Sequence, residues 1–406
     1  MKVLVIDEEI PFPMNSGKRL RTLNLLKPLA KRHEITFLCR YHEDTDKPDI
    51  QAMEQCGIRT RVVPHPIRKK AGLKFYSALL ANLASKDPYS VTSHYSKQMM
   101  EATAQILAER PYDLIHCEWT PYAVNLKSFL SGPSVVVAHN VESLIWQRYF
   151  EVESNPFKKA YIYLQWKKME RFESMAFQMF TQTVAVSDQD RQAIEQWIPK
   201  ERVSVVENGV DVSYFQPSSD KSKPFSLVFT GAMDWRPNVD AMFYFIDEIW
   251  ARVLRDYPQS TLTIVGRNPM ATLRDHVQNM ESVKLTGTVD DVRPYLNAAQ
   301  VYIVPLRVGG GSRLKILEAF SMGLPVVSTS VGAEGLCVTQ GQHVLFANDP
   351  QNFADAIGEL FNDQLLREQL GEEGQRLVHE HYRWDSLARR LEEVWEKTLE
   401  NKRSES

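Results

Sequence analysis

Short apolar runs rich in β-branched residues alternate with longer segments of helical period along most of the chain. In the first half the strand-like runs are Lys2–Ile6, Glu34–Leu38, Thr60–Val63, Asp113–Cys117, Ser134–Ala138, Thr183–Val186 and Val203–Val206. A helix-like segment, Gly17–Arg32, lies between the first two. Because near-continuous apolar strands separated by helices are typical of a parallel sheet covered on both faces, this half predicts a doubly wound α/β domain.

The same alternation starts again after a polar stretch that contains two prolines. Its strand-like runs are Ser226–Thr230, Thr261–Val265, Val283–Leu285, Val301–Val304, Pro325–Ser328 and His343–Phe346. Residues 214–224 show no apolar period, so we expect a hinge there between domains 1–213 and 225–380. A surface loop within one large sheet is the alternative.

The last segment, residues 381–406, contains one more amphipathic pattern. Trp384–Leu399 carries apolar residues at helical spacing, which predicts a helix with a polar end. Two doubly wound domains would face a cleft with the carboxyl ends of their strands, where such sheets bind ligands. We therefore look for chemistry at the strand ends.

Length, charge and cysteine content narrow the class of protein. The 406 residues carry 48 Lys and Arg against 51 Asp and Glu, and this net charge of -3 offers a polyanion no attraction. Nucleic acid is therefore not an expected partner. The four cysteines form no zinc or disulfide pattern, and neither a signal peptide nor a run of about 18 apolar residues is evident. We expect a cytoplasmic protein.

Two segments combine cations with apolar and aromatic residues. Arg68–Leu83 has a basic start and apolar positions at helical spacing, and Phe157–Phe180 interleaves lysines with aromatics. Both would suit a helix resting on a membrane surface, at the inner face of the membrane. Core packing explains the apolar positions equally well.

The most informative stretch is VPLRVGGGSRLKILEAFSMGLPVVS, Val304–Ser328. Its helix-capping residues predict a helix from Arg313 to Met322, with Ser312 as N-cap and Gly323 in the left-handed position after the last helical residue. Glycines in a loop before a helix allow backbone N–H groups to approach a phosphate. Together with Arg313 and Lys315 they predict an anion site, and Glu318 would bind sugar hydroxyls. A solvated Lys315–Glu318 ion pair is the alternative.

Two further strand ends carry candidate groups. The first strand ends at Asp7 and leads through PFPMNSGKRLR into a helix with Gly17 at its entry, where Lys18, Arg19 and Arg21 crowd the helix start. A plain turn with solvated charges explains this loop as well. His139 follows the run SVVVA and could bind substrate or organise its charge. His379 and His381 lack accompanying ligands, so no metal site is expected.

The chain resembles the retaining GT-B glycosyltransferases of family four over nearly its whole length. The residues that carry the resemblance are AHNVE, VAVSDQDRQAI, VVENGVDVSYF, FTGAM, IVG, LTGTVDDV and GGGSRLKILEAFSMGLPVVST, together with the opening through Gly17. The resemblance implies a GT-B fold, that is, two Rossmann-like domains facing a cleft with the final helix crossing back to the first domain. It implies no cofactor and no essential metal.

The resemblance also implies roles for individual residues. Glu318 would bind the donor ribose, and His139 would contact the donor sugar near the reacting carbon. Gly17 would lie near the phosphates. The diphosphate would be surrounded by the backbone of Gly231, Gly310, Gly311, Ser312 and Arg313–Lys315, including Leu314. Two positions depart from the family pattern. Gly310 stands where the family has its first motif glutamate, and GAMDWRPN lacks the usual basic pair, for which Arg313, Lys315, Arg236 or Arg267 would substitute.

These features predict a retaining hexosyltransferase. It would move a hexose-like sugar from a nucleoside diphosphate sugar to the hydroxyl of a sugar or glycolipid acceptor, in polysaccharide or glycolipid assembly. Two alternatives stay open: a catalytically silent sugar-nucleotide-binding scaffold or sensor, motivated by Gly310 and the missing basic pair, and a GT-B sugar-nucleotide epimerase.

Overall fold

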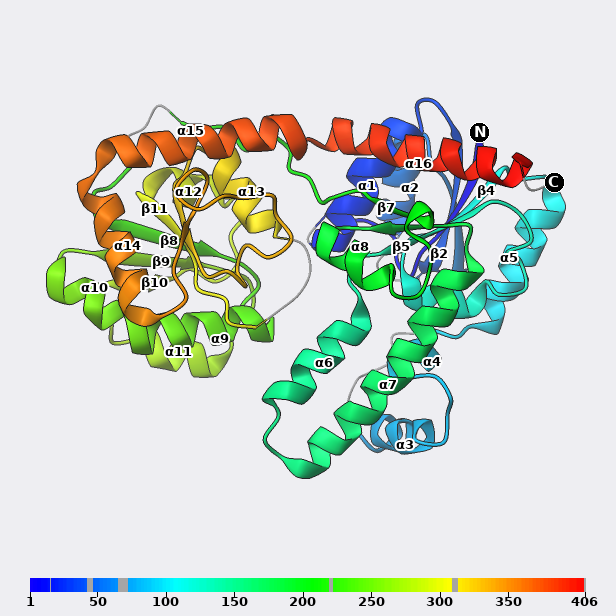
Figure 1. Cartoon of the computed structure of the whole chain (residues 1–406), viewed down its shortest axis with the longest axis horizontal. Helices are drawn as coiled ribbons and strands as arrows, with labels where there is room; N and C mark the ends of the chain where they lie inside the picture. Colours follow the sequence, from blue (N-terminus) through cyan, green and yellow to red (C-terminus); the bar gives the residue numbers. More distant parts are fainter. Residues whose placement is uncertain (15, 42–46, 65–71, 219–221, 309–312, 405–406) are drawn as a thin grey trace. The chain divides into compact units, whose positions relative to one another are not determined.

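The computed structural model describes residues 1–406 except 15, 42–46, 65–71, 219–221, 309–312 and 405–406. The chain forms two compact units, of which the first contains residues 1–207 and 385–406 and the second contains residues 208–384 (Figure 1). The division falls at residues 207/208, a few residues before the predicted hinge at 214–224, because Val210 N donates to Tyr382 O and residues near it pack on the second core.

The first unit is built on a parallel sheet in the order β3-β2-β1-β4-β5-β6-β7. Its strands are β1 Lys2–Ile6, β2 Glu34–Tyr41, β3 Arg59–Pro64, β4 Leu114–Cys117, β5 Ser134–Ala138, β6 Gln182–Ala185 and β7 Val203–Val205. Its helices are α1 Gly17–Leu29, α2 Lys47–Gln55, α3 Leu73–Asn82, α4 Tyr89–Thr92, α5 Lys97–Glu109, η1 Thr120–Asn125, α6 Glu142–Val152, α7 Pro156–Met179, α8 Asp188–Ile194 and η2 Lys200–Arg202.

The second unit repeats the arrangement with a parallel sheet in the order β10-β9-β8-β11-β12-β13. Its strands are β8 Ser226–Thr230, β9 Thr261–Val265, β10 Val283–Leu285, β11 Val301–Val304, β12 Val326–Ser328 and β13 Leu345–Phe346. Its helices are α9 Arg236–Tyr244, η3 Phe245–Trp250, α10 Ala251–Asp256, α11 Ala271–Val277, α12 Arg293–Ala298, α13 Leu314–Ser321, α14 Pro350–Asn362 and α15 Gln364–His381. The prediction of two doubly wound α/β domains is confirmed.

The last helix, α16 Trp384–Ser404, packs on the first unit, as the resemblance implies. Trp395 is fully buried, and its indole N–H donates to His116 Nδ1 at 3.1 Å. Glu392 accepts from Arg32 and His33, which follow α1. The chain therefore returns to its first domain through apolar packing, one buried hydrogen bond and a partly exposed ion pair.

Candidate functional site

The order of each sheet places a ligand-binding position at one pair of strands. In the first sheet the chain builds outward from β1 through β2 to β3 and then continues on the other side of β1 with β4. In the second sheet β8 and β11 occupy the corresponding places. The carboxyl ends of parallel strands at such a switch point open a crevice between the loops, where doubly wound sheets bind ligands.

Two glycines lie back to back at the carboxyl ends of β8 and β9. Gly231 N donates to Val265 O at 2.9 Å, and a Cβ on Gly266 would meet Gly231 O at 2.2 Å. A Cβ on Gly231 would lie 2.7 Å from Asn238 Nδ2 and 3.0 Å from Lys315 Nζ. Both positions therefore need glycine for close approach, and the backbone of Gly231 stays open to two polar side chains.

Lys315 brings a cation to this glycine loop. It lies in the first turn of α13, and its Nζ donates to Asn238 Oδ1 at 2.7 Å and lies 4.3 Å from the centroid of the Phe229 ring. Burial, reinforced by the charge of Arg313, lowers the pKa of Lys315 to about 7. The amine therefore gains or loses its proton near pH 7, and a bound anion would favour its charged form.

Glu318 lies one turn further along α13, on the same side as Lys315. Burial raises the pKa of Glu318 to about 7, although the nearby Lys315 opposes the shift. A buried carboxyl group gains free energy from a ligand that supplies hydroxyl groups. The arrangement of Lys315 and Glu318 can therefore hold an anion and neighbouring hydroxyls on one molecule.

Arg313 differs from its predicted place. Helix α13 begins at Leu314 and ends at Ser321, one residue inside the predicted bounds at each end, and Arg313 is its N-cap. The Arg313 guanidinium is 6% exposed and donates to Val331 O at 2.7 Å. The side chain therefore anchors the loop after β12. Gly323 has φ +72°, which confirms the left-handed position predicted after the helix.

The remaining candidates of the second domain have different surroundings. Arg236 is exposed at the first position of α9, and Arg267 is partly buried just after β9, where its carbonyl accepts from Met233 N. Leu314 opens α13. Gly310, Gly311 and Ser312 lie outside the described residues, so the predicted N-cap role of Ser312 and the conformation of the glycine loop stay predictions.

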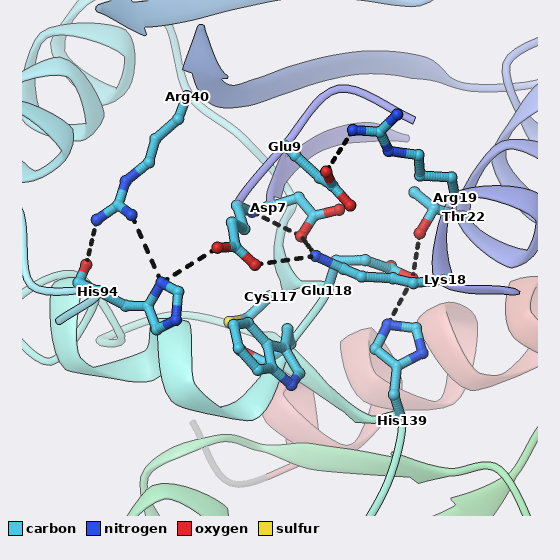
Figure 2. A network of polar contacts seen from close by, with 12 residues as sticks. Asp7, Glu9, Lys18, Arg19, Thr22, Arg40, His94, Cys117, Glu118 and His139 are labelled. Carbon is cyan, nitrogen blue, oxygen red and sulfur yellow. Dashed lines mark hydrogen bonds and ion pairs between the residues drawn. The ribbon is translucent and has the colours of Figure 1, made fainter. Parts of the chain in front are cut away.

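The first domain carries a network of charged groups at the carboxyl ends of β1, β2, β4 and β5 (Figure 2). Asp7 is 1% exposed, and its carboxylate lies 2.5 Å from Lys18 Nζ. Burial raises the pKa of Asp7 to about 6, although Lys18 opposes the shift. Lys18 also lies 5.3 Å from the ring centroid of Trp119. The alternative of a plain turn with solvated charges does not hold for Asp7 and Lys18, because both groups are enclosed and paired.

The other cations at the start of α1 also have partners. Arg19 donates to Glu9 at 2.5 Å. Arg21 is 1% exposed and donates to the carbonyls of Val206 and Glu207 at 2.7 and 2.6 Å. Gly17 is the first residue of α1, directly after the N-cap Ser16. The start of α1, including Gly17, is therefore fixed to the segment that follows β7.

His139 follows β5, as predicted, and it faces a carboxylate that the sequence analysis missed. Its Nε2 lies 3.5 Å from Glu118 Oε1, and the two side chains are 11% and 3% exposed. Glu118 also accepts from Thr22 Oγ1 at 3.0 Å and from His116 Nε2 at 2.7 Å. Burial acts to raise the pKa of Glu118, but His116 and His139 together hold it well below its ordinary value.

Two functional candidates could have been found from the sequence. Glu118 directly follows the strand Leu114–Cys117, so the strand-end argument that selected His139 selects it as well. Asn238 ends the segment GAMDWRPN, and its amide is a polar group at the start of a helix after a strand end. Neither residue could be paired with its partner from sequence alone.

In the part of the chain that is described, no group of three or more His, Cys, Asp or Glu side chains is placed to hold a metal ion. None of the helices, within the same residues, is both long and apolar enough to cross a bilayer.

Comparison with known families gives two adjoining matches. Residues 17–214 match the family described as Glycosyltransferase Family 4, and residues 224–363 match the family described as Glycosyl transferases group 1. The interval between the two matches, residues 215–223, lies shortly after the division between the two units at 207/208.

Individual relatives are distant in sequence. An uncharacterized 44.6 kDa protein in the cps region of Klebsiella pneumoniae is 23% identical, covering 88% of this chain and 90% of its own length. The Escherichia coli UDP-Gal:alpha-D-GlcNAc-diphosphoundecaprenol alpha-1,3-galactosyltransferase is 24% identical over 64% of this chain and 70% of its own. The crystal structure of Anabaena HepE in complex with UDP covers 98% of this chain and 100% of its own, with a TM-score of 0.68 at 17% identity. The last likeness shows a shared fold.

Proposed function

Because the chain belongs to the group 1, family-four glycosyltransferases of the GT-B fold, we propose that it is a retaining hexosyltransferase that uses a nucleoside diphosphate sugar. It moves the sugar to an acceptor hydroxyl in polysaccharide or glycolipid assembly. The galactosyltransferase relative, whose name gives a diphosphoundecaprenol acceptor, supports this class of acceptor. The base, the sugar and the linkage are left open.

The observation that carries the proposal is the placement of Lys315 Nζ at the N-terminus of α13, 2.7 Å from Asn238 Oδ1 and directly beside Gly231. A diphosphate at this position would meet a cation, backbone N–H groups and the positive end of a helix dipole. Glu318, one turn further on, would accept hydrogen bonds from the ribose hydroxyls. This placement also meets the need for a substitute for the missing basic pair.

The same groups suit the chemistry of sugar transfer. When the glycosidic bond to the diphosphate breaks, negative charge develops on the leaving oxygen. Lys315 and the α13 N-terminus would stabilise that charge, so the proposed reaction needs no divalent metal. A departing phosphate oxygen can accept the proton of the attacking hydroxyl on the same face, which retains the anomeric configuration. In this proposal His139 contacts the donor sugar, as the resemblance implies.

Membrane contact is part of the proposal because a lipid-linked acceptor lies at a bilayer. Phe157 at the start of α7 is 86% exposed, Val152 at the end of α6 is 65% exposed, and Lys158 is exposed beside them. This group of side chains at the turn between α6 and α7 would insert apolar tips and a cation into the inner face of the membrane. Flotation with anionic liposomes, with Phe157→Ser as the variant, tests this part.

The enzymatic proposal is tested by following the anomeric protons of nucleoside diphosphate sugars by NMR in EDTA, with the protein and with candidate acceptors. Transfer to an acceptor, or slow hydrolysis, that gives a product with the donor's own anomeric configuration supports a retaining transferase. An inverted product would contradict retention.

The position of Gly310, eight residues before Glu318, favours a second candidate, a silent sugar-nucleotide sensor. That candidate predicts saturable binding without turnover. Conversion of the donor alone into its epimer would instead identify an epimerase.

A further inference from the structure

A chain of buried polar groups connects the C-terminal helix to His139 inside the first unit. It runs from Trp395 on α16 to His116 on β4, from His116 to Glu118 just after β4, and from Glu118 to His139 just after β5. Trp395 and His116 are fully buried, and Glu118 is 2% exposed. Each buried polar group costs free energy unless it has a hydrogen-bond partner. The donors and acceptors along this chain therefore determine which nitrogen of each histidine carries the proton.

The first bond fixes the tautomer of His116. The indole of Trp395 can only donate, and its Nε1 lies 3.1 Å from His116 Nδ1. Nδ1 must therefore carry a lone pair, and the His116 proton resides on Nε2. That nitrogen lies 2.7 Å from Glu118 Oε2, which places the proton in a hydrogen bond to the carboxylate. The C-terminal helix thus sets the direction of the bond that holds Glu118.

The second oxygen of Glu118 faces His139. Oε1 accepts from Thr22 Oγ1 at 3.0 Å and lies 3.5 Å from His139 Nε2, an atom that is buried and makes no hydrogen bond within the described residues. A carboxylate can only accept, so it favours the His139 tautomer with its proton on Nε2. The same tautomer leaves Nδ1 of His139 with a lone pair for another group.

We propose that Glu118 is a positioning residue that holds the His139 imidazole in one tautomer and orientation for sugar transfer, and that Trp395 secures Glu118 through His116. The inference rests on the proposed function, in which His139 contacts the donor sugar. It adds three residues, Glu118, His116 and Trp395, to the determinants of turnover. The C-terminal helix thereby contributes to the site as well as to the stability of the fold.

Nitrogen-15 NMR of histidine-labelled full-length protein tests the tautomer without any substrate. In the wild type, His116 and His139 should both show a protonated Nε2 and an unprotonated Nδ1. Glu118→Gln should shift His139 toward the tautomer with its proton on Nδ1, because the His116 Nε2–H needs the amide oxygen as its acceptor and the amide NH2 group is then left facing His139 Nε2. An unchanged His139 spectrum in a folded Glu118→Gln variant would overturn the proposal.

Kinetics with the donor form the second arm. Glu118→Gln should lower kcat about 10- to 100-fold with little change in KM, the range found when the outer hydrogen-bond partner of a metal-binding histidine is removed. Trp395→Phe, which removes one N–H donor, should lower kcat about fivefold. Trp250→Phe is the matched control, since it removes a buried indole donor to Ser282 in the second unit, and it should leave kcat unchanged.

The two arms separate failure of this inference from failure of the proposed function. A changed His139 tautomer with unaltered kcat would overturn the positioning role. If the wild type turned over no donor, the proposed function would fail, and the NMR arm would still decide whether Glu118 sets the His139 tautomer.

Discussion

Replacing Lys315 with methionine should weaken nucleoside diphosphate binding strongly at low pH and only slightly at high pH. Lys315 Nζ lies beside Gly231 and Asn238, and its pKa is lowered to about 7 by burial and by the charge of Arg313. Methionine keeps the length and the apolar stem of the side chain and removes the charge. The difference between the two proteins therefore reports the contribution of the ammonium group to diphosphate binding.

The magnitude follows from the charge and from its titration. A hydrogen bond from a charged group contributes about 1.5–3 kcal/mol, which is about 10- to 150-fold in Kd. Below pH 7 the free protein already carries the proton and the full difference should appear. Above pH 7 binding must take up a proton, which costs about 1.4 kcal/mol for each pH unit above the pKa. The wild-type affinity should thus fall up to about tenfold per pH unit and approach that of the variant near pH 9.

Isothermal titration calorimetry in EDTA, with whichever of UDP, GDP, ADP or dTDP binds, measures both effects. Titrations in two buffers of different ionisation enthalpy at pH 8 should show uptake of about one proton by the wild type and none by Lys315→Met. Lys223→Met is the matched control, because this exposed lysine lies before β8, at the opposite end of that strand from Gly231. Equal affinities of wild type and Lys315→Met at pH 6.5 would refute the reasoning.

Three further predictions concern the framework of the two sites. Gly266→Ala places a Cβ 2.2 Å from Gly231 O, so it should cost about 1–3 kcal/mol of stability in thermal unfolding and weaken nucleotide binding. Gly132→Ala is the control, because its Cβ would meet nothing within 4 Å, and it should change neither stability nor binding. Arg21→Met leaves the buried carbonyls of Val206 and Glu207 without their donor and should lower the free energy of unfolding in urea by about 3 kcal/mol. The Glu392 pKa lies below its ordinary 4.5, chiefly because Arg32 donates to it and then because His33 does, while burial opposes the shift. The stabilisation that ionised Glu392 provides is therefore present above pH 4.5 and is lost as the pH falls through the lowered pKa. Glu392→Gln should lower the free energy of unfolding in urea by about 1 kcal/mol at pH 7, and this free energy should depend less on pH under acid conditions than in the wild type. An unchanged dependence on acid pH would contradict this.

The strands could be predicted closely because parallel strands buried on both faces leave an uninterrupted apolar signal. Lys2–Ile6, Ser134–Ala138, Ser226–Thr230 and Thr261–Val265 have the predicted bounds. The end of α13 could also be predicted, because Gly323 is the residue type that adopts positive φ at no steric cost. Local chemistry determines such features, and the sequence records it directly.

The polar partners could not be predicted, because they are distant in sequence. Arg21 donates to the carbonyls of Val206 and Glu207, which lie 185 and 186 residues further along the chain. The sequence of a helix start does not distinguish a solvated charge from a buried one. Glu118 carries no motif beyond its place after a strand. Arg313 donates to Val331 O, a partner that no sequence pattern indicates. Only the fold decides these pairings.

The central claim is that a nucleoside diphosphate sugar binds beside Gly231, Lys315 and Glu318 in the second domain. The most direct test is a metal-free thermal-shift panel of UDP, GDP, ADP, dTDP and their common sugars on the wild type and on Glu318→Ala. A ligand at about 100 times its Kd should add about 2.7 kcal/mol of stability, so we expect a selective shift with one nucleotide in the wild type and its loss in the variant. If no nucleotide stabilised the wild type, or if the shift persisted unchanged in Glu318→Ala, the proposed donor site would be contradicted.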